Sequence, residues 1–395
     1  MPDAKRRAAL WALIAAALFA GWQELTVIRN FDGNLTALFC TGNTQPIPPS
    51  LRPGTYLVSS STGYDGQMYR YVAHDPFLMG EAHRYLDNPA LRTNRILIPG
   101  LAWLLALGRQ SAIDTMYILL FPFACFAGAY WIALYLNAHS VSPSYCLLFL
   151  LVPATLTATD RLVVDLPFCA LSAAVVWYGY AGKRNALFAA LLLACLCRET
   201  GFILLAAFVA SALFERHWRK AVLFSAAALP TLAWYFFVHH QLAGSTRAAA
   251  GWLPAWLGKV GAIGPFYWLL HPFPYPFVSW VAVLAQTFDR LAILGMLLSF
   301  ALALWYGLRQ PKEPVHLAAL LFTASAALTF DPEFWQETYN FVRPFSPLLL
   351  IVGLHSVAVA RHRWLWLLPA AMVDLRIGFQ LSPQILGVLG IHAAR

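Results

Sequence analysis

Long apolar runs separated by short polar loops recur along this sequence, and they restrict the folds that it can adopt. Since a helix needs about 20 mostly apolar residues to cross a bilayer, the chain has room for roughly ten crossings. The pattern predicts an all-α fold, a polytopic bundle of transmembrane helices. The runs cover residues 8–22, 96–107, 116–136, 145–158, 162–181, 186–214, 221–238, 281–308, 317–330, 344–360 and 364–373.

Composition supports a lipid environment. Of the 395 residues 60% are hydrophobic and 11% are charged, whereas an ordinary soluble domain is about 25% charged. The net charge of +9 comes from Lys and Arg in short loops, which is typical of a cytoplasmic excess of basic residues. There is no basic cluster of the kind that binds nucleic acid, so we expect membrane lipid and not nucleic acid as a partner.

The N-terminus predicts the orientation of the chain. Lys5, Arg6 and Arg7 precede the first apolar run, which we interpret as a retained first helix with its N-terminus in the cytoplasm. Residues 29–94 then form a polar first loop on the outer face. Within it, Met68, Tyr71 and Val72 recur at helical spacing, which predicts a short interfacial helix lying on the membrane that ends before Pro76.

Two threadings of the later runs remain open, and both describe one membrane domain over residues 1–395 with residues 29–94, 241–276 and 331–340 outside. The alternative threading breaks the 186–214 run into a hairpin at Arg198-Glu199, which returns Lys183 and Arg184 to the cytoplasm; it needs a second adjustment upstream of Asp160. The simpler threading leaves Lys183 and Arg184 outside and places the other basic loops inside: Arg109, Arg161, residues 216–220, Arg309 with Lys312, and Arg361 with Arg363.

Asp65 is the first candidate for chemistry. It lies in the first loop between Tyr64 and Gly66-Gln67, where the glycine would let a bulky substrate approach the backbone. Asp-Gly is also a common turn dipeptide, but the density of charge nearby exceeds what a turn requires. A carboxylate base beside cations that hold an anionic group would explain it. The polar neighbours are Arg70, His74, Asp75, Asp87, Asn88, Arg92, Asn94 and Arg95.

Charged residues within the apolar runs are a second set of candidates, because an ionisable side chain in a membrane is costly unless it has a partner. Asp165 lies in an apolar stretch and needs a partner. Arg198 and Glu199 are adjacent, so on a helix they point to different sides. Each must therefore reach another group, such as Asp165 or a ligand, unless the role is purely structural.

The third candidate segment is residues 331–344, which contains Tyr339 and ends at Arg343-Pro344. Proline is well tolerated in the first turn of a helix, so Arg343 lies at a helix mouth, where a guanidinium can bind a phosphate. Snorkelling to lipid headgroups is the alternative. The sequence contains no P-loop, no HExxH and no GxSxG, and His239-His240 alone is not a metal signature.

Several of these motifs resemble those of a known group. Tyr64-Asp65-Gly66-Gln67-Met68-Tyr69, Asp75-Pro76-Phe77, Leu86-Asp87-Asn88-Pro89-Ala90, Arg95-Ile96-Leu97-Ile98-Pro99 and Arg198-Glu199-Thr200-Gly201 are similar to segments of bacterial multi-pass membrane proteins. Those proteins in turn resemble the GT-C glycosyltransferase superfamily, which includes the GPI mannosyltransferases with a Trp-Asp-Gly-type first-loop motif. In architecture the resemblance covers most of the chain, and in sequence it covers these short motifs.

The resemblance implies a GT-C-like fold in the bacterial inner membrane and an inverting glycosyltransferase. Such an enzyme moves a sugar from a polyprenyl-phosphate donor to a glycan or lipid acceptor on the outer face. It implies Asp65 as the catalytic base, with Arg343, Arg95 or Arg198 holding the phosphate and Asp75 as a second acid. Asp65 has no adjacent acid, unlike many relatives, which leaves open whether a divalent cation takes part. The other residues assigned to substrate binding are Tyr64, Gln67, Arg70, Asp165, Glu199 and Tyr339.

Two further function classes remain. A transporter or flippase of a lipid-linked glycan would use the buried charges as a path, with Asp65 binding and not reacting. Paired charges along several helices and inverted repeats would favour it, and no repeat is visible. A non-catalytic subunit of a surface polysaccharide assembly complex would be expected to have lost the acids and bases of the first loop, which this chain retains.

Overall fold

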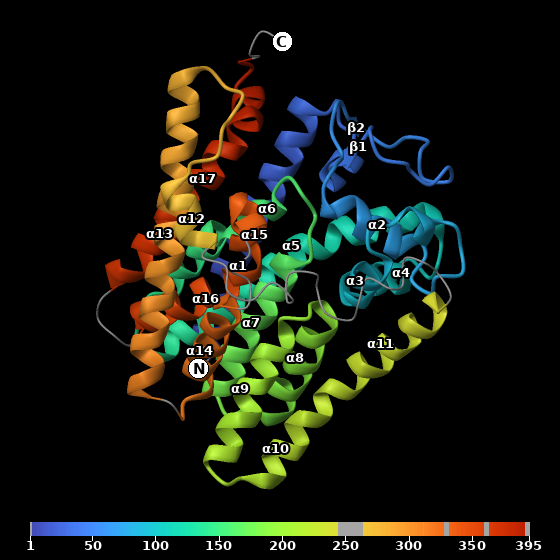
Figure 1. The fold of residues 1–395 in the computed structure, drawn as a ribbon. Helices are drawn as coiled ribbons and strands as arrows, with labels where there is room; N and C mark the ends of the chain where they lie inside the picture. Colours follow the sequence, from blue (N-terminus) through green and yellow to red (C-terminus); the bar gives the residue numbers. More distant parts are fainter. Residues whose placement is uncertain (1, 244–263, 311, 328–331, 359–362, 392–395) are drawn as a thin grey trace.

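The computed structural model describes residues 2–243, 264–310, 312–327, 332–358 and 363–391, so the predicted outer loops at 241–276 and 331–340 lie partly outside the described residues. Within these ranges the chain is mostly helical (Figure 1). The strands described are β1 (Thr41–Gly42) and β2 (Leu57–Val58), which form one parallel pair in the first loop. The predicted all-α class is confirmed.

The helices follow one another with short connections, and η marks a 3₁₀ helix. In chain order they are α1 (Pro2–Asn30), η1 (Leu35–Phe39), α2 (Asp65–His74), η2 (Ala82–Tyr85), α3 (Pro89–Asn94), α4 (Leu97–Leu105), α5 (Gln110–Ala138), η3 (Pro143–Leu151), α6 (Pro153–Ala158), α7 (Asp165–Tyr180), α8 (Arg184–Cys197), α9 (Gly201–Phe214), α10 (Trp218–Ser225), η4 (Ala226–Ala228), α11 (Leu229–Leu242), α12 (Gly264–Leu270), α13 (Ser279–Arg309), α14 (Pro314–Ala327), α15 (Pro332–Gln336), α16 (Thr338–Ala358) and α17 (Arg363–Val388).

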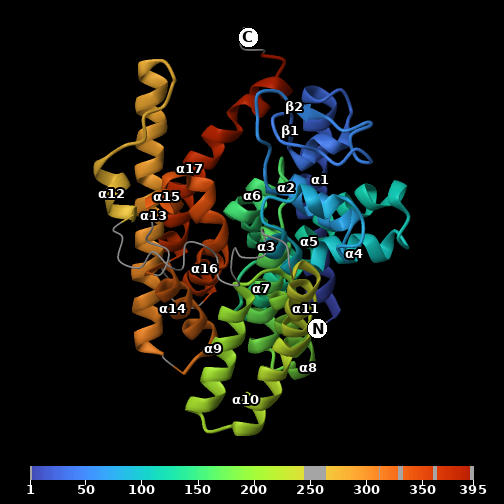
Figure 2. The ribbon, with the colours of Figure 1, turned by 45° about the vertical axis from the view of Figure 1, so that its right-hand side comes forward.

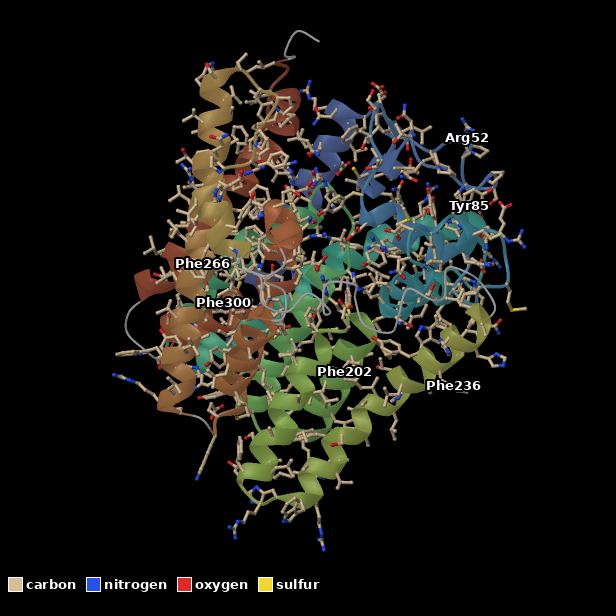
Figure 3. All side chains as sticks on the ribbon, viewed as in Figure 1. Arg52, Tyr85, Phe202, Phe236, Phe266 and Phe300 are labelled. Atoms are coloured by element: carbon tan, nitrogen blue, oxygen red, sulfur yellow. The ribbon has the colours of Figure 1, made fainter. Side chains whose placement is uncertain are left out.

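Several helices could span a membrane. Large apolar side chains also face outward, among them Phe236 on α11 and Trp280 on α13, which are 66% and 71% exposed; Figure 3 labels Phe236. An apolar outer surface of this kind is suited to lipid. In the described part of the chain, the five helices long and apolar enough to cross are Asp3–Asn30, Gln110–Ala138, Trp218–Leu242, Ser279–Arg309 and Thr338–Ala358.

Among these five, α16 is the most enclosed. Of its most apolar window 83% is buried, against at most 50% for the others. It packs against α7, α13, α14 and α17, and it lies among them in both ribbon views (Figures 1 and 2). A charged side chain on α16 is therefore surrounded by protein and needs protein partners.

The 186–214 run is two helices, α8 and α9, separated by residues 198–200. Arg198 has an extended backbone, with φ −158° and ψ 148°. Gly201 is required at the turn, because a Cβ there would lie 2.3 Å from the Ala194 carbonyl oxygen. The reversal brings Lys183 and Arg184 to the same end as Lys220. The structure thus contains the hairpin of the alternative threading.

The second adjustment that the alternative threading needs, upstream of Asp160, concerns residues 96–107. Helix α4 has nine residues, or roughly 14 Å at 1.5 Å per residue, which is less than half of a bilayer's hydrocarbon core. It packs against α2 and α5 without crossing. Helix α5 therefore starts at the first-loop end, where Asp114 pairs with Arg70. The simpler threading was wrong in placing Arg109 at the opposite end.

The simpler threading was also wrong about the position of Arg161. After α5, the chain returns through η3 and α6, which share the predicted 145–158 run. Arg161 follows them, and its guanidinium carbon lies 4.6 Å from the ring centre of Tyr64 in the first loop. It is at the first-loop end and not among the basic loops around residues 216–220.

Helix α2 is the short helix predicted in the first loop, and it ends two residues before Pro76. Its residues from Gly66 to Ala73 are all buried, so it is enclosed by protein, and the prediction that it lies on the membrane was wrong. Gly66 also has a different role from the one expected. A Cβ at this position would lie 2.8 Å from the Phe39 carbonyl oxygen, so the close approach is made by the protein backbone.

Candidate functional site

A continuous network of ion pairs lies where the first loop meets α3, α7, α16 and the α8–α9 break. Four carboxylates alternate with four guanidinium groups, so the network has no net charge. In order of contact its members are Asp87, Arg92, Asp65, Arg343, Asp165, Arg198, Glu199 and Arg95. Six of the eight residues were chosen from the sequence as candidates. We call this set the ion-pair network.

Asp65 lies in the middle of the network. Its Oδ1 accepts a hydrogen bond of 2.9 Å from Nη2 of Arg92, and its Oδ2 accepts one of 3.0 Å from Nη1 of Arg343. Asp65 is also the first residue of α2, after Tyr64 in an extended conformation, and an acid is favoured at a helix N-terminus. Helix geometry and two cations therefore fix this carboxylate as an anion.

The ionisation of Asp65 follows from this environment. Burial raises the pKa of its carboxyl, but the positive charges of Arg92 and Arg343 outweigh burial and hold the pKa well below its usual range. The side chain is nevertheless 22% exposed, whereas those of Arg92 and Arg343 are 10% and 9% exposed. The carboxylate is thus the more accessible partner in both pairs.

Arg343 connects the two halves of the network. Its Nη1 lies 3.0 Å from Asp65 Oδ2 and 3.5 Å from Asp165 Oδ2, while its Nε donates to the Tyr339 carbonyl oxygen. Asp165 begins α7 and contacts Nη1 of Arg198. Arg343 lies near the start of the enclosed helix α16, so the network joins the first loop to the bundle.

The other end of the network is the pair between Arg95 and Glu199. Nε and Nη2 of Arg95 donate to the two oxygens of Glu199 at 2.8 and 2.6 Å, a bidentate geometry that is among the stronger kinds of ion pair. Arg95 also donates to the hydroxyl of Tyr69. Arg198 and Glu199 thus each have another partner, Asp165 and Arg95, and their own side chains also lie 3.7 Å apart.

Two tyrosines and two arginines form an aromatic wall beside Asp65. Arg343 lies over the Tyr64 ring at 4.8 Å, and Arg161 lies 4.6 Å from the Tyr64 ring centre and 4.8 Å from that of Tyr339. Burial raises the pKa of Tyr64 to about 12, so the phenol is protonated. Neither tyrosine hydroxyl has a hydrogen-bond partner among the described residues. Both hydroxyls are therefore buried with unused hydrogen-bonding capacity.

Besides Tyr64 and Tyr339, three residues chosen from the sequence lie outside the ion-pair network. Gln67 bridges the first loop, since its amide donates to the Thr62 carbonyl and accepts from the Gly42 N–H. Arg70 makes a bidentate pair with Asp114. Asp75 accepts hydrogen bonds from the backbone N–H groups of residues 79, 80 and 83 and lies 2.7 Å from His83 Nδ1. All three therefore hold loop structure in place.

Arg70 and Asp75 also line a separate pocket of about 510 Å³ in the first loop, together with Ser50, Glu81, Gln110 and Asp114. Because Arg70 is already saturated by Asp114, and Asp75 by backbone groups, the charges of this pocket have protein partners. Its lining does not include Tyr64 or Tyr339, whose buried hydroxyls have no partner among the described residues.

Three residues of the site were not chosen as site residues from the sequence: Asp87, Arg92 and Arg161. Arg92 belongs to α3, which Asn88 caps by accepting from the Leu91 N–H, and the Asn-Pro start of that helix is visible in the sequence. Nothing in the sequence distinguishes Arg92 from its basic neighbours. Arg161 follows Asp160 directly, and its Nε lies 3.5 Å from Oδ2 of Asp160.

The described residues contain no group of three His, Cys, Asp or Glu side chains placed to hold a metal ion. Each carboxylate of the ion-pair network is paired with an arginine. A divalent cation at Asp65 would therefore have to compete with two guanidinium groups.

Fold and site together define an all-α protein with helices that could span a membrane and a network of buried ion pairs at one end of the bundle. Comparisons of the chain with models of protein families, with curated proteins and with solved structures found no match. The chemistry of the site is therefore the basis for assigning a function.

Proposed function

We propose that the protein is a membrane glycosyltransferase of the GT-C type, a polytopic helical bundle that moves a sugar from a polyprenyl-phosphate donor to a glycan or lipid acceptor. The observation that carries the proposal is the position of Asp65 between Arg92 and Arg343. It provides a carboxylate to accept a proton beside guanidinium groups that suit a phosphate. The first-loop end of the bundle would be the outer face of a bacterial inner membrane.

The proposed reaction breaks the bond between the anomeric carbon and a phosphate oxygen of the donor. A new bond forms between that carbon and an acceptor hydroxyl oxygen, and the proton of the hydroxyl passes to Asp65. The polyprenyl phosphate leaves as an anion, which Arg343 and Arg92 would stabilise. The unpartnered hydroxyls of Tyr64 and Tyr339 would hydrogen-bond to the sugar.

Asp65 is a weak base in the free protein, because both arginines hold its pKa low. A donor phosphate would compete for the same guanidinium groups, since Arg binds phosphate and carboxylate in similar geometry. As Arg343 turns to the phosphate, Asp65 loses one cation and its pKa rises. In this mechanism the base becomes effective only when the donor is bound.

The test is transfer by the full-length protein in liposomes supplied with radiolabelled polyprenyl-phosphate-linked mannose, glucose or N-acetylglucosamine and an envelope glycan fraction. Label moving from the lipid to the acceptor is measured. We expect Asp65→Asn to remain folded, since Arg92 keeps Asp87 and Arg343 keeps Asp165, but to lose transfer by at least about 10²-fold.

The matched control is Asp114→Asn, which removes a carboxylate from the Arg70 pair near the same loop but outside the ion-pair network. It should retain transfer if size-exclusion chromatography shows a folded protein. Wild-type turnover in Asp65→Asn would show that Asp65 is not the base. A wild-type protein that carries a lipid-linked glycan across the bilayer, without transferring the sugar, would instead support a flippase.

A further inference from the structure

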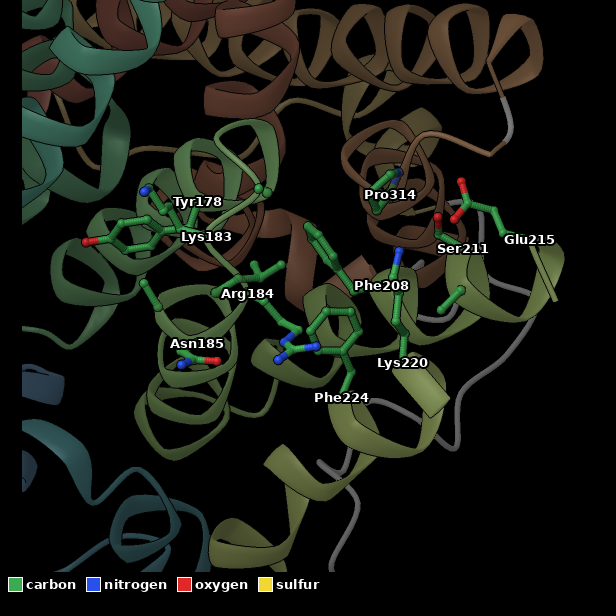
Figure 4. Close-up of a pocket in the computed structure, with 15 residues that line it drawn as sticks. Tyr178, Lys183, Arg184, Asn185, Phe208, Ser211, Glu215, Lys220, Phe224 and Pro314 are labelled. Atoms are coloured by element: carbon green, nitrogen blue, oxygen red, sulfur yellow. The ribbon is translucent and has the colours of Figure 1, made fainter. Parts of the chain in front are cut away.

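A second large pocket lies at the opposite end of the bundle from the first loop, near the α9–α10 turn (Figure 4). It has a volume of about 830 Å³, which is in the range of pockets that take small ligands. None of its residues belongs to the ion-pair network. The lining residues are Tyr178, Gly179, Gly182, Lys183, Arg184, Asn185, Ala186, Leu187, Phe208, Ser211, Ala212, Glu215, Lys220, Phe224 and Pro314.

Three cations line this pocket. Lys183 and Arg184 come from the start of α8, and Lys220 comes from α10. All three are exposed, and none has an ion-pair partner within the described residues. The acid of the lining is Glu215, whose Oε2 lies 3.0 Å from Nδ1 of His217. The rim of the pocket therefore carries an excess of positive charge that the described protein does not neutralise.

The wall of the pocket is apolar. Phe208 on α9 and Phe224 on α10 are buried in it, with 4% and 6% of their surface exposed, and Leu187 lies beside them. Figure 4 shows the two phenyl rings between the cationic side chains of Arg184 and Lys220. A ligand that matches this lining has an anionic group attached to an apolar body.

The surroundings of the pocket suit a membrane boundary. It lies at the ends of the apolar helices α8 and α9. On α10, Trp218 and Val222 are 66% and 72% exposed, so the surface next to the pocket is apolar too. Basic pockets between helices on the cytoplasmic side of a membrane can bind lipid headgroups.

We infer that this pocket binds the phosphate headgroup of an anionic phospholipid, with Lys183, Arg184 and Lys220 around the phosphate and an acyl chain along Trp218 and Val222 of α10. The exposed apolar side chains of Trp218 and Val222 next to the pocket favour a lipid over a soluble phosphate, which would leave them in water. The inference does not depend on the proposed transferase activity.

Binding is measured by native mass spectrometry of the full-length protein in detergent, with phosphatidylglycerol and phosphatidylcholine of the same acyl chains. We expect phosphatidylglycerol to bind at least about tenfold more tightly. The variant Lys183→Gln/Arg184→Gln/Lys220→Gln should lose this preference. If that variant still preferred phosphatidylglycerol as wild type does, the pocket would not be the lipid site.

The matched control is Arg216→Gln/Arg219→Gln/Lys312→Gln, which removes the same charge from positions outside the lining and should keep the preference. An equal loss in the control would mean that general surface charge, and not the pocket, attracts the lipid. Inorganic phosphate at the same concentration should not displace phosphatidylglycerol; displacement would mean that the site takes a soluble anion.

A second measurement works without the charge variants. Asn185 is exposed at the rim, so a bimane label on Asn185→Cys reports what enters the pocket, with labelled wild type as the background. Brominated phosphatidylglycerol should quench this label more than brominated phosphatidylcholine does. Equal quenching by the two lipids would contradict the headgroup site.

Discussion

Asp65 divides its two oxygens between Arg92 and Arg343, and this division determines how the carboxylate responds to acid. A carboxyl whose pKa is lower in the folded state than in the unfolded state stabilises the fold above its unfolded pKa. That stabilisation is lost as the pH falls through the folded pKa. For Asp65 the relevant pH range therefore lies below about 4, the ordinary pKa of an aspartate.

The melting temperatures of wild type and Asp65→Asn, measured against pH in the same detergent, test this response. We expect the variant to melt at a lower temperature at pH 7, because an amide pairs less well with two guanidinium groups. The difference in melting temperature between wild type and variant should stay constant from pH 7 down to about pH 4. It should become smaller only below that pH. A difference that closes between pH 7 and pH 5 would contradict the lowered pKa of Asp65.

At the scale of single residues, the sequence was most informative where a charge is costly. Arg198 and Glu199 lie between apolar runs, so partners for them could be expected, and Asp165 could be suggested as one. Nothing in the sequence was a reason to exclude Gln67 and Arg70 from the candidate site. Their partners, the backbone near residues 42 and 62 and the Asp114 carboxylate, become neighbours only in the folded chain.

The hairpin of α8 and α9 shows how one small residue sets the path of an element. Gly201 packs directly on the Ala194 carbonyl oxygen, and the reversal lets Arg198 and Glu199 leave the helical hydrogen-bonding pattern and reach different partners. In one straight helix over residues 186–214, Arg198 and Glu199 would both remain in the helical hydrogen-bonding pattern. Hydropathy does not distinguish the two arrangements, since the flanking helices are apolar in either.

Gly201→Val should therefore destabilise the protein by about 1–3 kcal/mol, the range for a side chain forced into filled space. Thermal unfolding in detergent measures this change. Gly21→Ala is the control, because a Cβ at Gly21 has no atom within 4 Å, and it should not lower the melting temperature. Equal melting temperatures for Gly201→Val and wild type would mean that the hairpin does not need this close contact.

For the whole molecule, the class of fold followed from composition, but the path of the chain did not. Residues 96–107 and 145–158 are as apolar as the crossing helices, yet they form α4, η3 and α6. An apolar run can be buried by other parts of the protein as well as by lipid. The sequence alone does not show whether protein or lipid will surround a given run. Counting apolar runs therefore does not tell which of them are long membrane-spanning helices.

The two ends of the bundle should be reached by water from opposite sides of a membrane. In sealed vesicles of a Cys40→Ser background, a membrane-impermeant maleimide should label Arg52→Cys and Lys183→Cys from different sides. Both positions are exposed; the first is in the first loop, and the second is next to the basic pocket. Labelling of both from the same side would contradict a bundle that spans the membrane.

The hydrogen bond between Asp65 and Arg343 joins residues 278 positions apart, and this has a consequence for biosynthesis. At roughly 5–20 residues per second, a ribosome takes on the order of tens of seconds to make the segment between them. During that time Asp65 has Arg92 but not Arg343 as a partner, since α16 does not yet exist. The first loop is thus synthesised early and completed late, and a chain interrupted before α16 would leave the centre of its ion-pair network unformed.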